Sequence, residues 1–286
     1  MRSIFRTIAL LTLLFGLTSC RMDSLYIQIP GTNWSIEQGD QRLMVHFGDE
    51  RFASIQRNNE TGGLQVTNGT YTAKGHSVAV TADHDGSIHK LVRTFSHLKN
   101  SSNKNFSSFW PEAPETMENT VWTTILNNDF LLLYFTADGK VKKAVFRNVV
   151  REEGVPYGWS RTESTYALAG NQLAMGDESG TVFPEVMLVE DLFYYHFPVN
   201  PDTGYSDLKG TFWTYQTASY PGIIVFDTNS SFTRVLLSNN HQYQVDRGTY
   251  QREGNVLTLA MDDKEEACAF DGNSFTFLER TYDSFE

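Results

Sequence analysis

Cysteine is the rarest residue type here with reactive chemistry, since only two occur in 286 residues, and one of them is Cys20. A cysteine thiolate can act as a nucleophile or bind a metal. Cys20 follows a short apolar stretch, residues 8–17, and Arg2 and Arg6 lie before that stretch. A cationic start and about ten apolar residues are typical of an export signal, whereas a membrane-spanning helix needs about twice that length. We therefore predict that residues 1–19 are a signal peptide.

The four residues that end at Cys20 resemble the cleavage site of bacterial lipoproteins. They read LTSC, with leucine three positions before the cysteine and two small residues between. The resemblance implies that a diacylglyceryl group is attached to the Cys20 sulfur and that residues 20–24 are a lipidated tether. Two or more acyl chains hold a soluble body stably at a membrane. We expect an outer-membrane lipoprotein that faces the periplasm or the cell surface.

A second modification site lies in the same tether. Residues 23–25 read DSL, which resembles the acceptor for O-glycosylation in Bacteroides-type bacteria, with Ser24 as the modified residue. Together with the lipoprotein signal, this motif indicates a lipoprotein of that bacterial group.

Net charge and cysteine content exclude some properties of the exported body. The chain carries a formal charge of −11, which disfavours nucleic acid as a partner and electrostatic docking on anionic lipid. After lipidation Cys268 is the one remaining thiol, so we expect no intramolecular disulfide. We interpret Cys268 as a small buried strand residue, which is the commoner role. Packing of the 20 Phe, 13 Tyr and 5 Trp residues must then supply stability.

Aromatic residues recur at fixed spacing and divide the body into three units. In each unit a phenylalanine follows a tryptophan by 13 residues, at the end of an apolar run, and a tyrosine follows later. The sets are Trp34, Phe47 and Tyr71; Trp122, Phe135 and Tyr166; and Trp213, Phe226 and Tyr250. Tryptophan and tyrosine are 37 residues apart in the outer units and 44 in the middle one, so we predict a seven-residue insertion around residues 151–159. We predict that these nine residues occupy equivalent core positions.

Alternating apolar and polar residues, separated by turn-forming residues, predict short strands within each unit. We place the units at residues 25–98, 119–197 and 208–286, with polar linkers at 99–118 and 198–207. Each unit has room for about eight strands, and such a meander closes into an up-and-down barrel.

This pattern resembles small bacterial lipocalin-like domains. The resemblance implies an all-β fold with three tandem antiparallel β-meander units of lipocalin-like barrel or half-barrel type. The sequence departs from the family pattern in one place. The family has glycine two residues before the tryptophan, whereas Gly31 and Gly210 lie three residues before it. The family's arginine, which packs on that tryptophan from the last strand, corresponds to Arg93 and Arg280. The middle unit has no counterpart, so the resemblance predicts closure of that unit less firmly.

Motifs for catalysis or metal binding are missing from the sequence. The stretch DHDG at residues 83–86 begins like a calcium loop, but Thr94 occupies the position that needs a carboxylate, so we interpret it as a hairpin turn. His84 and His89 have no evident third ligand. Adjacent carboxylates such as Glu265 and Glu266 point to opposite faces of a strand, as do Glu152 and Glu153. We expect no metal, no cofactor and no enzymatic activity.

An aromatic cluster at residues 193–197 supplies candidate ligand residues. Alternation places Phe193, Tyr195 and Phe197 on one face, where core packing accounts for them, and leaves Tyr194 and His196 on the other. Three functions stay open: a binding or interaction module for an apolar or amphipathic ligand or an envelope partner, a glycan-binding surface lipoprotein, and a hydrolase. A deep apolar cavity would favour the first, an exposed row of aromatic residues the second, and a cleft with convergent carboxylates the third.

Overall fold

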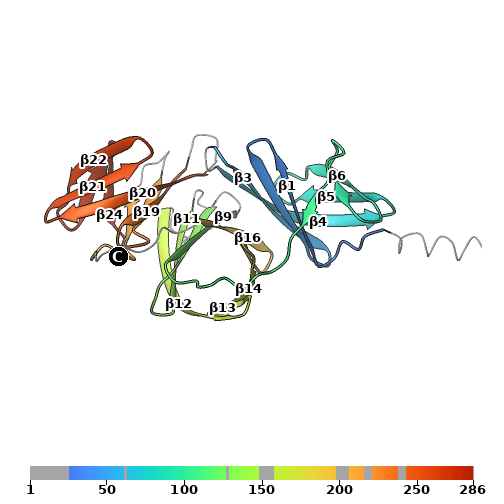
Figure 1. The fold of residues 1–286 in the computed structure, drawn as a ribbon, viewed down its shortest axis with the longest axis horizontal. Helices are drawn as coiled ribbons and strands as arrows, with labels where there is room; N and C mark the ends of the chain where they lie inside the picture. Colours follow the sequence, from blue (N-terminus) through green and yellow to red (C-terminus); the bar gives the residue numbers. More distant parts are fainter. Residues whose placement is uncertain are drawn as a thin grey trace, which may run out of the picture. The chain divides into compact units, whose positions relative to one another are not determined.

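The structure is a computed structural model that describes residues 26–60, 63–126, 129–147, 158–197, 206–215, 221–237 and 243–285. All of the elements in these ranges are β-strands, which confirms the predicted all-β class. They build three antiparallel groups of eight strands, drawn in blue to cyan, green to yellow and orange to red in Figure 1. One residue pair, Leu64 with Tyr243, also joins the first group to the third. We name the three groups the N-terminal, middle and C-terminal barrels. In the described ranges, no helix has the length and apolar character needed to cross a membrane.

The chain divides into two compact units. The first consists of Met1–Gln38, Leu43–Ser54 and Thr67–Phe109, and the second of Gly39–Arg42, Ile55–Val66 and Trp110–Glu286. Most of the N-terminal barrel belongs to the first unit, and the middle and C-terminal barrels belong to the second. The sequence predicted three bodies joined by linkers, but two of the three barrels form one compact body.

The N-terminal barrel is a meander in which each of the strands β1 to β6 pairs with the next, and β8 pairs with β1. Its strands are β1 (Thr32–Gln38), β2 (Gln41–Phe47), β3 (Arg51–Asn58), β4 (Leu64–Lys74), β5 (Ser77–Ala82), β6 (Ile88–Arg93), β7 (Leu98–Lys99) and β8 (Ser107–Ser108). Trp34 pairs with Ser108 at the return. A bridge between Lys99 and Asn105 brings the two ends of the sheet together, so the barrel is nearly closed.

Part of the predicted linker 99–118 belongs to this barrel. β8 lies within it, and Phe106 is buried in the barrel core. The linker prediction was wrong there because it relied on composition. Serine and asparagine are typical of linkers, but they also suit tight turns around a short strand.

The middle barrel is closed. Its strands are β9 (Thr120–Leu126), β10 (Asp129–Phe135), β11 (Lys140–Arg147), β12 (Gly158–Ala169), β13 (Gln172–Met175), β14 (Glu178–Val182), β15 (Val186–Val189) and β16 (Leu192–Phe197). Closure joins β16 to β9, where Tyr195 pairs with Thr123. From the missing arginine, the sequence predicted closure of this barrel less firmly than closure of the other two. That inference was wrong, because closure depends on strand number and register and not on one arginine. The predicted insertion falls between β11 and β12, where residues 148–157 lie outside the described ranges.

The C-terminal barrel has the strand order β22-β21-β20-β19-β18-β17-β24-β23. Its strands are β17 (Phe212–Tyr215), β18 (Gly222–Val225), β19 (Ser231–Leu237), β20 (Tyr243–Glu253), β21 (Val256–Met261), β22 (Lys264–Ala269), β23 (Ser274–Phe277) and β24 (Arg280–Ser284). A bridge between Phe270 and Phe275 brings the ends of the sheet together, so this barrel is also nearly closed.

The repeated aromatic residues occupy equivalent positions, as the sequence predicts. The tryptophans and phenylalanines are all buried in the three barrel cores. In each barrel the phenylalanine and tyrosine rings meet edge to face, at centroid distances of 5.0, 4.9 and 4.6 Å. Each tyrosine hydroxyl then donates to a backbone carbonyl just beyond the phenylalanine: Gly48 at 2.7 Å, Thr136 at 3.3 Å and Thr228 at 2.9 Å.

A threonine two residues before each tryptophan explains the short motif around it. Its hydroxyl accepts a hydrogen bond from the indole Nε1 of the tryptophan, at 2.8, 2.9 and 2.8 Å in the three barrels. The same hydroxyl donates to the carbonyl three residues earlier, at 2.5, 2.5 and 2.6 Å. The preceding residue has a positive φ in every case: 73° at Gly31, 58° at Asn119 and 79° at Gly210. Glycine and asparagine tolerate that conformation best.

The middle and C-terminal barrels share a buried face. Alternate residues of β10 belong to the interior core, so Phe130, Leu132 and Tyr134 point outward, yet each is at most 1 % exposed. Tyr134 Oη donates to the carbonyl of Asp227 (3.3 Å), and its ring lies 6.2 Å from that of Phe212. Residues of β18 and β19 outside the interior core are buried as well: Ile223, Val225, Thr233 and Val235. This apolar contact makes one body of two barrels.

Candidate functional site

The predicted ligand candidates Tyr194 and His196 lie inside the middle barrel. Tyr194 is 2 % exposed and belongs to the apolar core, and the His196 ring stacks on Trp122 with 4.4 Å between ring centroids. Phe193 and Tyr195 on the opposite face are also buried. The alternation is as predicted, but β16 is buried on both faces. Core packing therefore accounts for Tyr194 as well as for its neighbours.

Burial keeps both of these side chains neutral. It raises the pKa of Tyr194 far above the ordinary value and, with a smaller effect from the charge of Arg247, lowers the pKa of His196 to about 4. His196 Nε2 is buried and has no hydrogen-bond partner among the described residues. A neutral imidazole stacked on an indole serves packing, and neither side chain lines the pockets described below.

The remaining candidates have structural roles or lie outside the described residues. Cys20 and Ser24 lie outside the described residues. Cys268 is 5 % exposed, and burial, together with the charge of Glu266, raises its thiol pKa to about 11. Such a thiol is unreactive at neutral pH.

The DHDG stretch at residues 83–86 forms the turn between β5 and β6 that the sequence predicts. The backbone N–H of Ser87 donates to Asp85 Oδ1 (2.8 Å), which lowers the pKa of that carboxyl group. Within the described ranges, no three histidine, cysteine or carboxylate side chains come together as a metal site requires.

The two arginines assigned by the lipocalin resemblance lie over tyrosines. The Arg93 guanidinium is 5.4 Å from the Tyr26 ring centroid, and that of Arg280 is 5.7 Å from the Tyr215 ring centroid. The resemblance therefore identified aromatic contacts of these residues, but with tyrosine rings.

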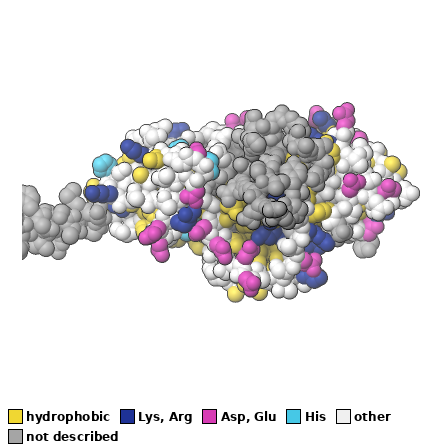
Figure 2. All heavy atoms as spheres, turned by 180° about the vertical axis from the view of Figure 1, so that it is seen from behind, with side chains coloured by type: hydrophobic (Ala, Val, Ile, Leu, Met, Phe, Trp, Pro, Cys, Tyr) yellow, Lys and Arg dark blue, Asp and Glu magenta, His cyan; other side chains and the backbone are white. Residues whose placement is uncertain are grey.

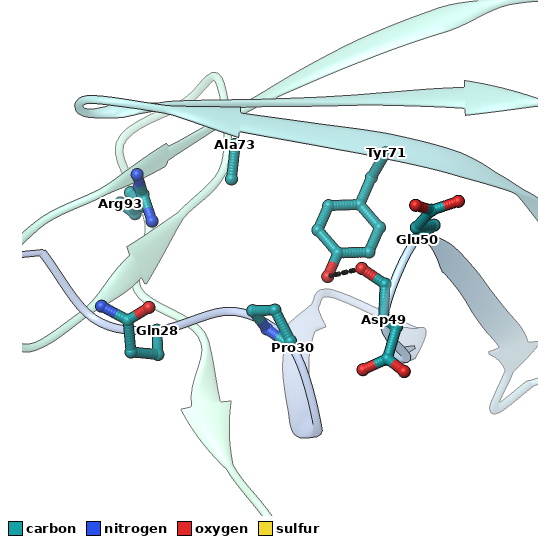
Figure 3. Close-up of a pocket in the computed structure, with 7 residues that line it drawn as sticks. All are labelled: Gln28, Pro30, Asp49, Glu50, Tyr71, Ala73 and Arg93. Carbon is teal, nitrogen blue, oxygen red and sulfur yellow. Dashed lines mark hydrogen bonds between the residues drawn. The ribbon is translucent and has the colours of Figure 1, made fainter. Parts of the chain in front are cut away.

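A polar pocket of about 470 Å³ lies in the first unit, beside the turn before β1 and the hairpin between β2 and β3 (Figure 3). Its lining residues carry both donors and acceptors of hydrogen bonds. They are Gln28, Pro30, Asp49, Glu50, Tyr71, Ala73 and Arg93. Sequence reasoning had assigned Tyr71 to the core, and it had not considered the hairpin residues as ligand contacts.

Backbone hydrogen bonds position the two largest side chains of this pocket. Tyr71 Oη donates to the carbonyls of Gly48 (2.7 Å) and Asp49 (3.2 Å), and Figure 3 marks the second of these. Burial, and to a lesser extent the charge of Asp49, raises the pKa of Tyr71. Arg93 is 5 % exposed, and its Nε donates to the carbonyl of Gly75 (2.5 Å). The phenol and the guanidinium are thus held in place before any ligand binds.

The two carboxylates of this pocket diverge. Asp49 and Glu50 are neighbours in sequence, and Figure 3 shows their carboxylates pointing away from each other. Catalytic carboxylate pairs must face one substrate from two sides at a defined separation. The pocket can therefore bind a ligand through hydrogen bonds and charge.

A second polar pocket, of about 610 Å³, lies in the second unit. Lysines dominate its charge: Lys140, Lys142 and Lys209. Lys140 Nζ lies 3.0 Å from Glu163 Oε1, and Lys142 Nζ donates to the carbonyl of Gly210 (2.6 Å). The carboxylate of Glu163 offsets the charge of Lys140, and the carbonyl of Gly210 holds the Lys142 ammonium group in place.

The two pockets are lined by residues at equivalent positions of the repeat. Each includes residues of the hairpin that follows the repeated phenylalanine: Asp49 and Glu50 in one, and Asp138 and Asn229 in the other. Each also includes the turn before the repeated tryptophan. The sequence signal is the run of polar residues after each phenylalanine, and it becomes useful only when the repeat is placed on a barrel.

Comparison with known proteins identifies no family. Neither a model of a known protein family nor the sequence of a curated protein matches the chain. Among solved structures it is similar to the β subunit of DNA polymerase III from Pseudomonas aeruginosa, at 7% identity, TM-score 0.13 and coverage of 91% of this chain and 94% of that one. A putative β subunit from Eubacterium rectale gives 5% identity, TM-score 0.15 and coverage of 94% and 95%. Similarity at these TM-scores carries no argument about fold or function.

Proposed function

We propose that the chain is a non-catalytic binding module of the bacterial cell envelope, anchored by lipid on Cys20, whose N-terminal barrel binds a polar ligand of glycan type. The observation that carries the ligand class is the lining of the 470 Å³ pocket. A guanidinium, an amide, two carboxylates and a phenol surround it, and sugars are recognised through such groups beside an aromatic ring.

An apolar ligand inside a barrel has less support. The interior positions of the barrels hold large apolar side chains that pack against one another, such as Trp122, Phe135 and Tyr194 in the middle barrel. A ligand that entered there would have to displace these side chains. The polar pockets lie instead at barrel ends, where a hydrophilic ligand reaches them from solvent.

The glycan proposal predicts that binding depends on the exposed pocket residues. We expect the exported chain to bind one glycan class on an array of envelope and host glycans. Combined Gln28→Ala, Asp49→Ala and Glu50→Ala changes should weaken that binding at least tenfold, because each removes a hydrogen-bonding group. These side chains are exposed, so folding should be unaffected. Asp263→Asn, in the hairpin between β21 and β22 of the second unit, is the control. Equal binding by the triple variant would refute the proposed pocket.

The anchor makes a separate prediction. Cys20→Ala should move the protein from the membrane fraction to the soluble fraction, or leave its signal peptide uncleaved, because the thioether cannot form without the sulfur. Cell fractionation and the mass of the mature protein report the two outcomes. Normal cleavage with unchanged membrane association would contradict the lipoprotein proposal. Cys268→Ala is the control, since that thiol is buried.

A further inference from the structure

The outer face of β4, β5 and β6 in the first unit carries lysines and apolar side chains but no carboxylate. Alternate residues of β5 lie in the core, so Ala79 and its register partners Thr72 and Lys90 point outward. Where the three strands pair, the other outward positions are serine or threonine, apart from five residues: Lys74, Ala79, Ile88, Lys90 and Val92. We refer to this surface as the β4–β6 face.

Exposed apolar side chains gather on this face and at its edge. Ile88 is 63 % exposed and Val92 is 39 % exposed. Phe95, which is 69 % exposed, lies two residues after the end of β6, and its ring stacks on Tyr26 at a centroid distance of 5.5 Å. Side chains this large and this exposed in one region mark an interaction surface more often than isolated ones do.

The charge of this region is opposite to that of the whole chain. No aspartate or glutamate occurs between Asp85 and Glu112, although the chain has 34 of them. The cations of that stretch are Lys90, Arg93, Lys99 and Lys104; of these, Lys90 lies on the β4–β6 face, and Arg93 is buried. Figure 2 shows dark blue, cyan and yellow side chains together at the end of the first unit on the left of the described atoms, with most of its magenta side chains lower down.

The proposed anchor brings this region close to lipid. Tyr26 follows Cys20 by six residues, and six residues span at most about 20 Å when fully extended. Tyr26 contacts Phe95 through its ring, and the backbone N–H of Ile27 donates to the carbonyl of Thr94 (3.1 Å). If Cys20 is lipidated, the edge of the β4–β6 face therefore lies within one short tether of the membrane surface.

We propose that the β4–β6 face, with Tyr26 and Phe95 at its edge, binds the anionic phospholipid surface of the membrane that carries the anchor. Aromatic rings favour the boundary between headgroups and acyl chains, and lysines near anionic lipid add attraction. The net charge of −11 predicted no such docking. Only charges within a Debye length of the lipid take part, however. The outward charges of the three strands, Lys74 and Lys90, are cationic, and the acidic residues Asp83 and Asp85 lie in the turn beyond Ile88. This proposal rests on the proposed lipid anchor.

Vesicle binding of the exported chain without lipid tests the face directly. We expect residues 20–286 with Cys20→Ala to bind phosphatidylethanolamine vesicles that contain phosphatidylglycerol, and to bind them less at high salt. Ile88→Ser, Val92→Thr and Phe95→Ser together should lower the partition coefficient at least tenfold. Lys74→Gln with Lys90→Gln should remove most of the salt dependence. Leu126→Ser with Val256→Thr, at exposed apolar positions of the second unit, is the matched control and should bind like the parent chain.

Three results would overturn the proposal: no binding by the parent chain, equal binding by the face variant and the control, or equal binding to uncharged vesicles. A change of oligomeric state in the face variant, without a change in vesicle binding, would assign the face to a protein partner instead. Circular dichroism melting of each variant verifies that it is folded. The anchor is tested separately by fractionation of Cys20→Ala cells, so either proposal can fail without the other.

Discussion

In the Trp213→Ala variant we expect the middle and C-terminal barrels to unfold together, about 10 °C below the wild type. Trp213 is 3 % exposed, and its ring contacts those of Phe270 and Phe275 at 5.4 and 5.3 Å. Truncation of a buried tryptophan costs about 3 to 5 kcal/mol through lost burial and a residual cavity. In a body of this size, each kcal/mol lowers the melting temperature by about 2 to 4 °C.

Joint unfolding follows from the buried face that the two barrels share. If the C-terminal barrel unfolded alone, Phe130, Leu132 and Tyr134 of the middle barrel would become exposed to water. Exposure of buried apolar side chains costs about 1.5 to 3 kcal/mol each. The sequence predicted linkers between all three units, and units separated by linkers would unfold independently. Because the two barrels share a buried face, we expect them to unfold together instead.

Hydrogen exchange followed by mass spectrometry, combined with calorimetry, decides between joint and separate unfolding. In Trp213→Ala we expect amides of β9–β16 to lose protection together with those of β17–β24. Trp110→Ala is the matched control. Because Trp110 is 72 % exposed, this variant should melt within about 2 °C of the wild type. Loss of protection confined to β17–β24 would show that the barrels are independent.

Asp227→Ala should destabilise the second unit by about 3 to 5 kcal/mol, because it leaves a cation without its partner in the protein interior. Asp227 is fully buried. It accepts hydrogen bonds from Ser231 Oγ (2.7 Å), Thr233 Oγ1 (2.8 Å) and Arg247 Nη2 (2.7 Å). Its carbonyl also accepts from Tyr134 of the middle barrel. No sequence motif indicated this residue.

A double variant separates the cost of the unpaired cation from the loss of packing. Arg247→Met in the Asp227→Ala background should recover part of the stability, since it removes the unpaired charge. The surface pair of Arg252 and Asp207 provides the control, because Asp207 is 59 % exposed in its side chain. Asp207→Ala should cost about 1 kcal/mol or less. Urea denaturation gives the free energy of unfolding of the wild type and of the three variants. Equal losses of stability in Asp227→Ala and Asp207→Ala would refute a structural role of the buried pair.

Local sequence patterns determined the repeat and its core. The spacing of Trp34, Trp122 and Trp213 identified equivalent residues, because each barrel needs the same buried indole beside the same threonine. Alternation identified strands for a similar reason, since residues i and i+2 of a strand share one face. The sequence also located the hairpin turn at residues 83–86, where the conformation of a few neighbouring residues is sufficient.

Tertiary structure alone decided which surfaces are covered. Phe130, Leu132 and Tyr134 point away from their own barrel, and only the presence of a second barrel explains why they are apolar. The same limit applies to the pocket, where Gln28, Asp49 and Arg93 meet although they are far apart in the chain. Periodicity within one strand reports that a side chain leaves the barrel interior, but it carries no information about what that side chain meets, because the partner belongs to a distant part of the sequence.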